Sequence, residues 1–180
     1  FIFSTKLNAE TISTDITASA DTDPAGTRKT ITEDLTVTSS GSFTCTKIGN
    51  CIHFGGSGLT IDNQGTIKIN GSDVDNIIRA ANSSDDNSTV NNSGTIVTET
   101  GNNAIFYSAT DSGYIYNTGT ISATTKSYTI QTRDNTNFKI DNYGTITNSS
   151  SSGQTIFSRT VSDPDTGTII NNYAGAVISA

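Results

Sequence analysis

The sequence predicts an all-β protein built as a parallel β-helix, a solenoid whose coils have about 25 residues and three short strands each. Two observations predict this fold. A seven-residue pattern recurs, in which an apolar residue leads through Asn and Gly to Thr-Ile; its regular copies are Ile61–Ile67, Val90–Ile96, Ile115–Ile121 and Ile140–Ile146. The glycines of these copies and of a looser fifth copy fall at 65, 94, 119, 144 and 175, at intervals of 29, 25, 25 and 31 residues. A period in this range is typical of stacked repeats.

Each copy predicts a strand, a tight corner and a second strand. The flanking Ile and Val residues are β-branched and favour strands, whereas Asn and Gly accept the left-handed backbone angles of a corner. We expect the corners to stack as a ladder in which Asn side chains satisfy backbone groups. The predicted ladder residues are Asn63, Gly65, Asn92, Gly94, Asn117, Gly119, Asn142 and Gly144. We also expect one buried column made of Ile67, Ile96, Ile121 and Ile146.

Two further strands complete each coil. One begins 9 to 11 residues after each regular glycine, as in Asn103–Phe106, and another leads into the next corner, as in Gly113–Tyr116. The two longer intervals contain polar insertions at 82–87 and 162–167, which we expect to be outer loops.

Composition excludes several classes of protein. Only 32% of residues are apolar and 15% are charged, but the aliphatic residues are phased, which argues against disorder from about residue 35 onward. The net charge of -7 and the scattered basic residues argue against a nucleic-acid partner. Since no apolar run reaches the length of a membrane helix, no membrane-spanning segment is predicted.

The chain divides into three parts. Residues 1–9 are apolar at the start and end in a small residue, which fits either the remnant of a signal peptide or a first strand. Residues 10–34 are expected to form an N-terminal cap, in which Ile16 and Ile31 cover the first coil. Residues 35–180 form the β-helix, which we expect to be truncated because the pattern is still running at Ala180.

Cys45 and Cys51 lie six residues apart around Gly49. Such a pair can close a short disulfide loop, which fits an oxidising compartment, and two reduced thiols are the alternative. A zinc site needs more ligands than His53, the one histidine of the sequence.

Copies of the form apolar-x-Asn-x-Gly-Thr-Ile at this period resemble the passenger domains of bacterial autotransporters (type V secretion), in the AIDA/pertactin-like group. The resemblance covers residues 35–180. It implies a right-handed β-helix, secreted or displayed on the outer-membrane surface of a Gram-negative bacterium. It also implies a role in adhesion, self-association or biofilm formation, with a host or bacterial surface glycan or protein, or a second copy, as partner.

Catalytic chemistry finds little support. Some autotransporter passengers are serine proteases, but Thr110 precedes Asp111-Ser112-Gly113 where that motif requires Gly. For a glycan-active enzyme, Asp62 and Asp141 share a repeat position, yet lie about three coils, or roughly 14 Å, apart. Arg79 and Arg133 are each isolated in the sequence. We therefore predict no catalytic residue.

Metal and cofactor sites are not predicted either. The stretch Gly55–Thr60 approaches a calcium-binding nonapeptide, but Thr60 replaces its Asp and only one copy is present. The pairs Asp85–Asp86 and Asp163–Asp165 are expected to lie in solvated loops. No cofactor is expected.

Four tyrosines remain as a candidate ligand surface: Tyr107, Tyr114, Tyr116 and Tyr128. Aromatic side chains on a β face can stack on sugars or pack on another protein, and the alternative is that they cover the edge of the core. The sequence thus favours a non-enzymatic extracellular protein in adhesion or self-association. A β-helical polysaccharide lyase or a depolymerase similar to phage tailspikes is the alternative.

Overall fold

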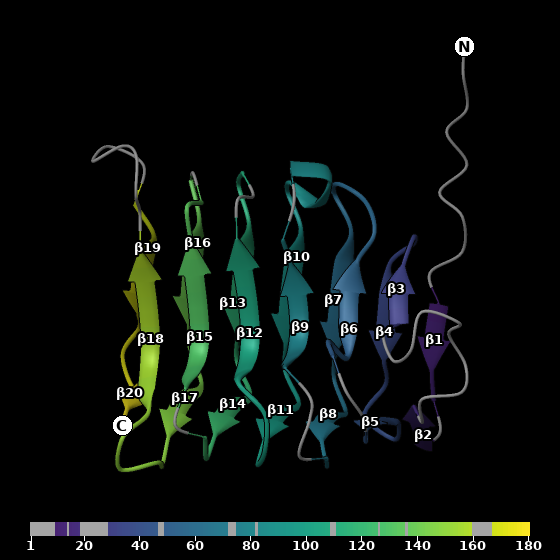
Figure 1. The fold of residues 1–180 in the computed structure, drawn as a ribbon, viewed down its shortest axis with the longest axis horizontal. Helices are drawn as coiled ribbons and strands as arrows, with labels where there is room; N and C mark the ends of the chain where they lie inside the picture. The colour runs from purple at the N-terminus through teal and green to yellow at the C-terminus, as the bar shows by residue number, and fades with distance from the viewer. Residues whose placement is uncertain are drawn as a thin grey trace.

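The computed structural model describes residues 10–13, 15–18, 29–46, 49–71, 75–81, 83–108, 111–125, 127–135, 137–159 and 167–180. The segment expected as a signal remnant or first strand, and the Asp163–Asp165 pair, lie outside these residues. Within them the chain is a parallel β-solenoid, which confirms the predicted fold class. Three parallel sheets, here called A, B and C, run along its length, and their strands stack side by side in Figure 1.

Each coil contributes one strand to each sheet. Sheet A consists of β1 (Glu10–Ile12), β4 (Leu35–Val37), β7 (Thr60–Asn63), β10 (Thr89–Asn92), β13 (Tyr114–Asn117), β16 (Lys139–Asn142) and β19 (Ile169–Asn172). Sheet B consists of β2 (Asp15–Ala18), β5 (Ser42–Cys45), β8 (Thr66–Ile69), β11 (Thr95–Thr98), β14 (Thr120–Ala123), β17 (Thr145–Asn148) and β20 (Val177–Ser179). Sheet C consists of β3 (Lys29–Ile31), β6 (Ile52–Phe54), β9 (Asn76–Ala80), β12 (Asn103–Ser108), β15 (Tyr128–Arg133) and β18 (Gln154–Arg159).

The core consists of aliphatic columns that run through the coils. Ile67, Ile96, Ile121 and Ile146 are register partners on successive strands of sheet B, and all four are fully buried. This confirms the predicted single column. Burying one such side chain contributes about 1.5–3 kcal/mol, so the columns supply the main driving force for coiling.

The asparagines at the corners form a continuous hydrogen-bonded ladder. The Nδ2 of Asn63 donates to the Oδ1 of Asn92, and the same 2.7 Å contact repeats upward through the later coils to Asn172. The Nδ2 groups of Asn63, Asn92 and Asn117 also donate to the Thr carbonyl that begins the next coil's second strand, at 3.1 to 3.3 Å. These bonds pair amide groups that would otherwise be costly to bury, and the Oδ1 of Asn63, at the start of the ladder, is the ladder atom without a partner among the described residues.

The corner glycines have a different role from the one we expected. None of the four regular corner glycines, nor their asparagines, has a positive φ, whereas Gly175 in the looser copy has φ 84°. The expectation of left-handed corners was therefore wrong. A Cβ on Gly119 would lie 2.1 Å from the carbonyl oxygen of Gly94, and one on Gly144 would lie 2.1 Å from that of Gly119. Glycine is needed because successive corners stack backbone against backbone.

The solenoid begins earlier than the boundary expected at Leu35. Strands β1, β2 and β3 pair in parallel with β4, β5 and β6, so residues 10–34 contribute a coil of their own. Ile12 and Ile31 are buried with the rest of the core. The expected cap is, in its described part, the first coil.

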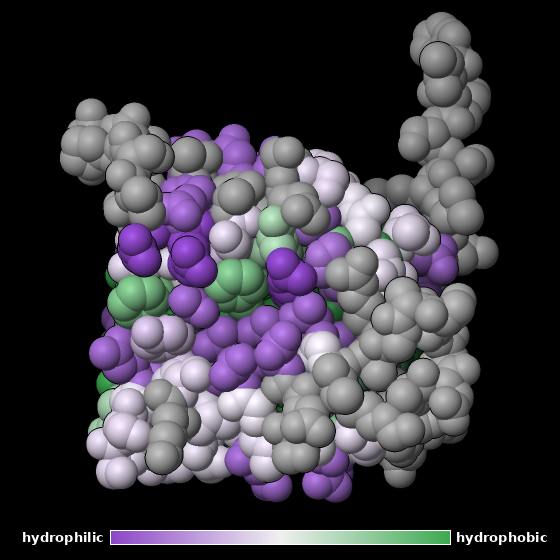
Figure 2. All heavy atoms as spheres, in the orientation of Figure 1, coloured by the Kyte–Doolittle hydropathy of each residue, from purple (hydrophilic) through white to green (hydrophobic). Residues whose placement is uncertain are grey.

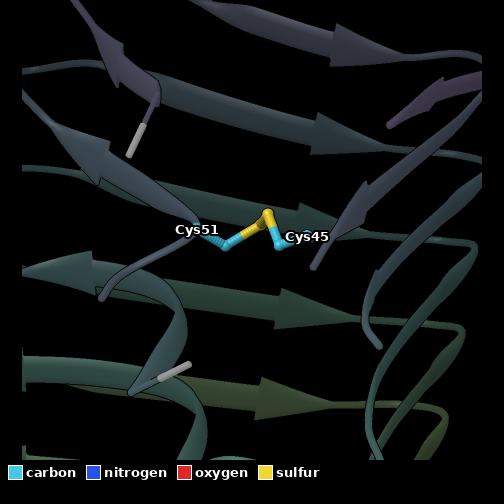
Figure 3. The surroundings of a disulfide bond; sticks show 2 residues. All are labelled: Cys45 and Cys51. Carbon is cyan, nitrogen blue, oxygen red and sulfur yellow. A yellow bond between two sulfur atoms is a disulfide. The ribbon is translucent and has the colours of Figure 1, made fainter. Parts of the chain in front are cut away.

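Cys45 and Cys51 form a disulfide that joins the end of β5 to the residue before β6, across the inside of one coil (Figure 3). Their Cα atoms are 5.7 Å apart, and both side chains are buried. Closing so short a loop contributes about 2 kcal/mol in the chain-entropy model.

The insertion in the 29-residue interval contains a three-residue 3-10 helix, η1 (Ser83–Asp85), between β9 and β10. Figure 1 shows it beyond the edge of the sheets. It is too short to cross a bilayer, and no other helix occurs among the described residues.

Candidate functional site

The four candidate tyrosines do not form one surface. Tyr114 and Tyr116 lie on β13 of sheet A, whereas Tyr128 lies on β15 of sheet C. Tyr107, on β12, is fully buried. The predicted ligand surface is therefore divided, and one member belongs to the core.

Tyr107 was wrongly expected at the surface. Its ring packs between Phe54 and Phe138, with centroid distances of 6.2 and 4.7 Å, and its hydroxyl donates to the carbonyl of Ser88 at 3.3 Å. Burial, and secondarily the charge of Asp85, raises the pKa of Tyr107. Its strand alternates, so that Tyr107 points inward like Ile105.

A row of exposed tyrosines follows the corner of sheet A, and we call Tyr116, Tyr143 and Tyr173 the tyrosine ledge. Their exposed fractions are 37%, 46% and 37%, which makes them the most exposed aromatic residues described. The rings of Tyr116 and Tyr143 are 5.5 Å apart and tilted. Those of Tyr143 and Tyr173 are stacked, 4.0 Å apart with an interplanar angle of 5°.

Sequence reasoning missed two of these three residues. Tyr143 and Tyr173 each follow directly after the corner Asn in the last two copies of the repeat. That shared repeat position was the available signal, because equivalent positions of successive coils become neighbours in space. Closeness along the chain, which led to Tyr107, was a poorer guide.

Asp141 lies next to the tyrosine ledge. The carboxylate is 5% exposed and accepts hydrogen bonds from Tyr114 Oη, Lys139 Nζ and Asn171 Nδ2, each at 2.7 Å. The hydroxyl of Tyr173 lies 3.4 Å from Oδ1. Register explains the cluster, since Tyr114 pairs with Lys139, and Asp141 pairs with Asn171.

The electrostatics of this cluster favour an ionised Asp141. Burial alone would raise the pKa of Asp141, but the hydrogen bonds from Lys139, Asn171 and Tyr114, with the positive charge of Lys139, lower it to about 2. Conversely, burial and the bond to Asp141 raise the pKa of Tyr114. The Nζ of Lys139 also lies 5.6 Å from the centroid of the Tyr114 ring. Asp141 is therefore a negative charge held beside the ledge, and Tyr173 is the ledge residue that donates a hydrogen bond to it.

A shallow depression of about 380 Å³ adjoins the ledge. It is lined by Asp62, Asn91, Asn92, Ser93, Tyr116 and Thr118. A carboxylate, amides, hydroxyls and one aromatic ring thus surround a space open to solvent. Such a mixture can hydrogen-bond hydroxyl or amide groups while the ring contacts an apolar surface.

The carboxylates that a glycosidase would need are not brought together. Asp62 and Asp141 occupy one row of sheet A, with Asn91 and Tyr116 between them, which confirms the predicted separation of three coils. Arg79 and Arg133, expected to be isolated, line one depression on sheet C. The expectation that they are isolated was wrong because it was based on their distance along the sequence, whereas strands from different coils lie together in sheet C.

The remaining chemical candidates have structural positions. Ser112 has φ 53° and lies in a bend before β13.

His53 is buried, with Nε2 3.8 Å from Oδ2 of Asp85. Asp85 itself is buried and accepts a hydrogen bond from the backbone N–H of Ala81, so the expectation that Asp85 is solvated was wrong. Among the described residues, no group of three or more His, Cys, Asp or Glu side chains could hold a metal ion.

Comparison with known proteins adds no assignment. No family model, no curated protein and no solved structure matches the chain.

Proposed function

We propose that this chain is a non-enzymatic binding module of a secreted or outer-membrane surface protein, active in adhesion or self-association like the autotransporter passengers that it resembles. The observation that carries the proposal is the tyrosine ledge beside the depression at Asp62 and Asn91. The parallel solenoid is compatible with such a passenger, and a buried disulfide suits an oxidising compartment.

The ledge has the properties of a contact surface. Tyrosine presents a large amphipathic side chain with only two rotatable angles, so ordering it on binding costs little entropy. Here the order exists before binding, because Tyr143 and Tyr173 stack on each other and Asp141 holds the neighbouring hydroxyls. Pre-ordered aromatic side chains of this kind are typical anchors for glycans and proteins.

The test compares Tyr143→Ala/Tyr173→Ala with the wild type. We expect beads coated with the double variant to bind fewer surface glycans and proteins than beads coated with the wild type. If the wild type self-associates in solution, we expect the double variant to sediment as a smaller species. Val97→Ala is the control, since it removes a partly exposed apolar side chain from sheet B, away from the ledge. Equal loss in both variants, or no loss in the double variant, would contradict a binding role for the ledge.

The alternative, a β-helical polysaccharide lyase or depolymerase, has its own readout. Incubating the protein with acidic and neutral polysaccharides and measuring new chain ends distinguishes binding from cleavage. We expect binding without new chain ends. Cleavage that persists after repeated purification would replace the proposed role with an enzymatic one.

A further inference from the structure

A second surface, on sheet C, gathers most of the arginines. Arg79, Arg133 and Arg159 are three of the four arginines of the sequence, and they lie on β9, β15 and β18. Arg133 and Arg159 are register partners on adjacent strands. A chain with a net charge of -7 thus concentrates its guanidinium groups on one sheet.

These guanidinium groups form no ion pair with another described residue. The ion pairs among the described residues involve Lys29, His53 and Lys139, and none involves these three arginines. The Nε of Arg133 is buried and has no hydrogen-bond partner in the described part of the chain. Leaving a buried N–H unpaired costs free energy, and an oxygen atom of a ligand would remove that cost.

Aromatic rings lie between the arginines. Phe106 is in register with Arg79, whose Cζ lies 6.0 Å from the ring centroid. Phe157 stacks on Tyr128, with centroids 4.5 Å apart and an interplanar angle of 19°. Figure 2 shows two hydrophobic patches on this face, over β12 and β18, within a strongly hydrophilic surface. Both phenylalanines are partly exposed.

Arg79, Arg133 and Phe106 line one depression of about 300 Å³. It is lined by Asn50, Asp75, Asn76, Arg79, Asn102, Asn103, Phe106, Gln131 and Arg133. The amides of Asn50, Asn76, Asn103 and Gln131 form a second ladder across β9, β12 and β15. Among the described residues, Gln131 enters it only as an acceptor, and its Nε2 can donate to a hydroxyl group of a ligand. We call Arg79, Phe106, Gln131, Arg133, Phe157 and Arg159 the arginine face.

The spacing on this face suits an extended carbohydrate. Phe106, Gln131 and Phe157 are register partners on consecutive strands. The two rings are therefore two strand spacings, or about 9.6 Å, apart along the solenoid. One strand spacing is close to the length that a pyranose ring adds to an extended chain. Aromatic faces can stack on such rings, and guanidinium groups bind carboxylates through paired hydrogen bonds.

We propose that the arginine face binds an extended acidic polysaccharide of the polyuronate class, lying along the solenoid axis. Phe106 and Phe157 contact alternate sugar rings, and Arg79, Arg133 and Arg159 bind the carboxylates. Gln131 donates to a hydroxyl between them. This site lies on a different sheet from the tyrosine ledge and does not depend on the function proposed there.

A nucleic acid fits this face less well. Proteins that bind single strands combine a positively charged groove that follows the backbone with aromatic side chains on which successive bases stack. The arginine face offers three cations spread over four coils, with Asp75 at one side of the depression, on a chain that is acidic overall. The amides that line the depression can also bind hydroxyl groups, which a polyuronate carries on every sugar ring and which the sugars within a DNA strand lack.

The experiment uses an oligogalacturonate hexasaccharide, a neutral glucan hexasaccharide and a short single-stranded DNA as probes in isothermal titration calorimetry. We expect the acidic hexasaccharide to bind, the neutral one to bind more weakly, and added salt to weaken the acidic one. Arg133→Gln and Arg159→Gln should each reduce affinity for the acidic probe by about tenfold. Lys68→Gln is the matched control, because it removes one positive charge from sheet B.

Several outcomes would overturn the proposal. These are no binding of the acidic hexasaccharide, an equal loss of affinity in Lys68→Gln, or tighter binding of the single-stranded DNA. Since Arg133 is partly buried, its variant is compared with the wild type by thermal unfolding, and the exposed Arg159→Gln serves where Arg133→Gln is unfolded.

Length provides an independent check. A disaccharide cannot reach from Phe106 to Phe157 and its flanking arginines, so it should bind at least tenfold more weakly than the hexasaccharide. Equal affinities would contradict a site that extends along the solenoid. The variant Tyr143→Ala/Tyr173→Ala should leave acidic-probe binding unchanged, so failure of one proposal is distinguishable from failure of the other.

Discussion

At the scale of the residue, the corner asparagines show how a polar side chain can be a core residue. Asn117 is fully buried, accepts from Asn92, and donates to Asn142 and to the carbonyl of Thr145. Removing its side chain breaks these three bonds, which takes one partner each from Asn92, Asn142 and the carbonyl of Thr145. Each such hydrogen bond contributes about 1 kcal/mol to stability.

We therefore predict that Asn117→Ala lowers the free energy of unfolding by about 3 kcal/mol. Asn91→Ala is the control, because Asn91 has the same side chain but lies outside the ladder; it should change stability by less than about 0.5 kcal/mol. Denaturant unfolding measures both. Similar losses for the two variants would show that the ladder is not a special source of stability.

Asp141 predicts a pH effect with a defined sign. Its pKa is about 2 in the folded protein, below the value of about 3.9 for an unfolded Asp. The ionised form therefore stabilises the fold above about pH 4, and this contribution disappears as the pH falls toward 2. The stability difference between wild type and Asp141→Asn should be constant from neutral pH to about pH 5 and shrink below it. Denaturant unfolding across this range measures it, and a difference independent of pH would contradict the assignment.

At the scale of the element, the corner decides how closely two coils approach. Gly119 places its Cα against the carbonyl of Gly94, where a Cβ would lie at 2.1 Å. Because the clashing atom belongs to the backbone, the clash can be relieved only by moving apart two strands that pair with each other in a parallel sheet. A methyl group at this position thus disturbs sheets A and B together.

Gly119→Ala is predicted to destabilise the protein by about 3 kcal/mol or more, in the range of severe overpacking. Gly167→Ala is the matched control, since no atom of the described residues lies within 4 Å of a Cβ there, and its effect should be below about 0.5 kcal/mol. Thermal unfolding of the two variants gives the comparison. A mild effect at Gly119 would mean that the corners can separate without loss of pairing.

At the scale of the whole molecule, the solenoid has no single centre. Each coil packs on the coil before and the coil after, so stability depends on position along the stack. Ile121 and Ile178 belong to one column of sheet B, but Ile121 is fully buried whereas Ile178 is only partly buried. The same substitution should therefore have unequal effects.

Ile121→Ala should cost about 3–4 kcal/mol, as expected for a cavity enclosed on all sides. Ile178→Ala should cost about 1 kcal/mol or less, because solvent already reaches the side chain. Chemical denaturation of both variants tests this difference. Equal costs would argue against coil-by-coil packing.

The sequence by itself determined the architecture, because a repeat with constant phase brings equivalent residues into register. The buried isoleucine column, the asparagine ladder and the strand order follow from that phase alone. For Tyr107, and for Arg79 with Arg133, the predictions were based on distance along the chain instead of on repeat position, and they were wrong.

Only the tertiary structure decided which surfaces exist. Tyr116, Tyr143 and Tyr173 come from three separate coils, and Asp141 becomes buried and strongly acidic only when Lys139, Asn171 and Tyr114 surround it. The same holds for the arginine face, which joins strands separated by whole coils. Repeat phase specifies which residues are neighbours, but the exposure and charge of a side chain depend on everything packed around it.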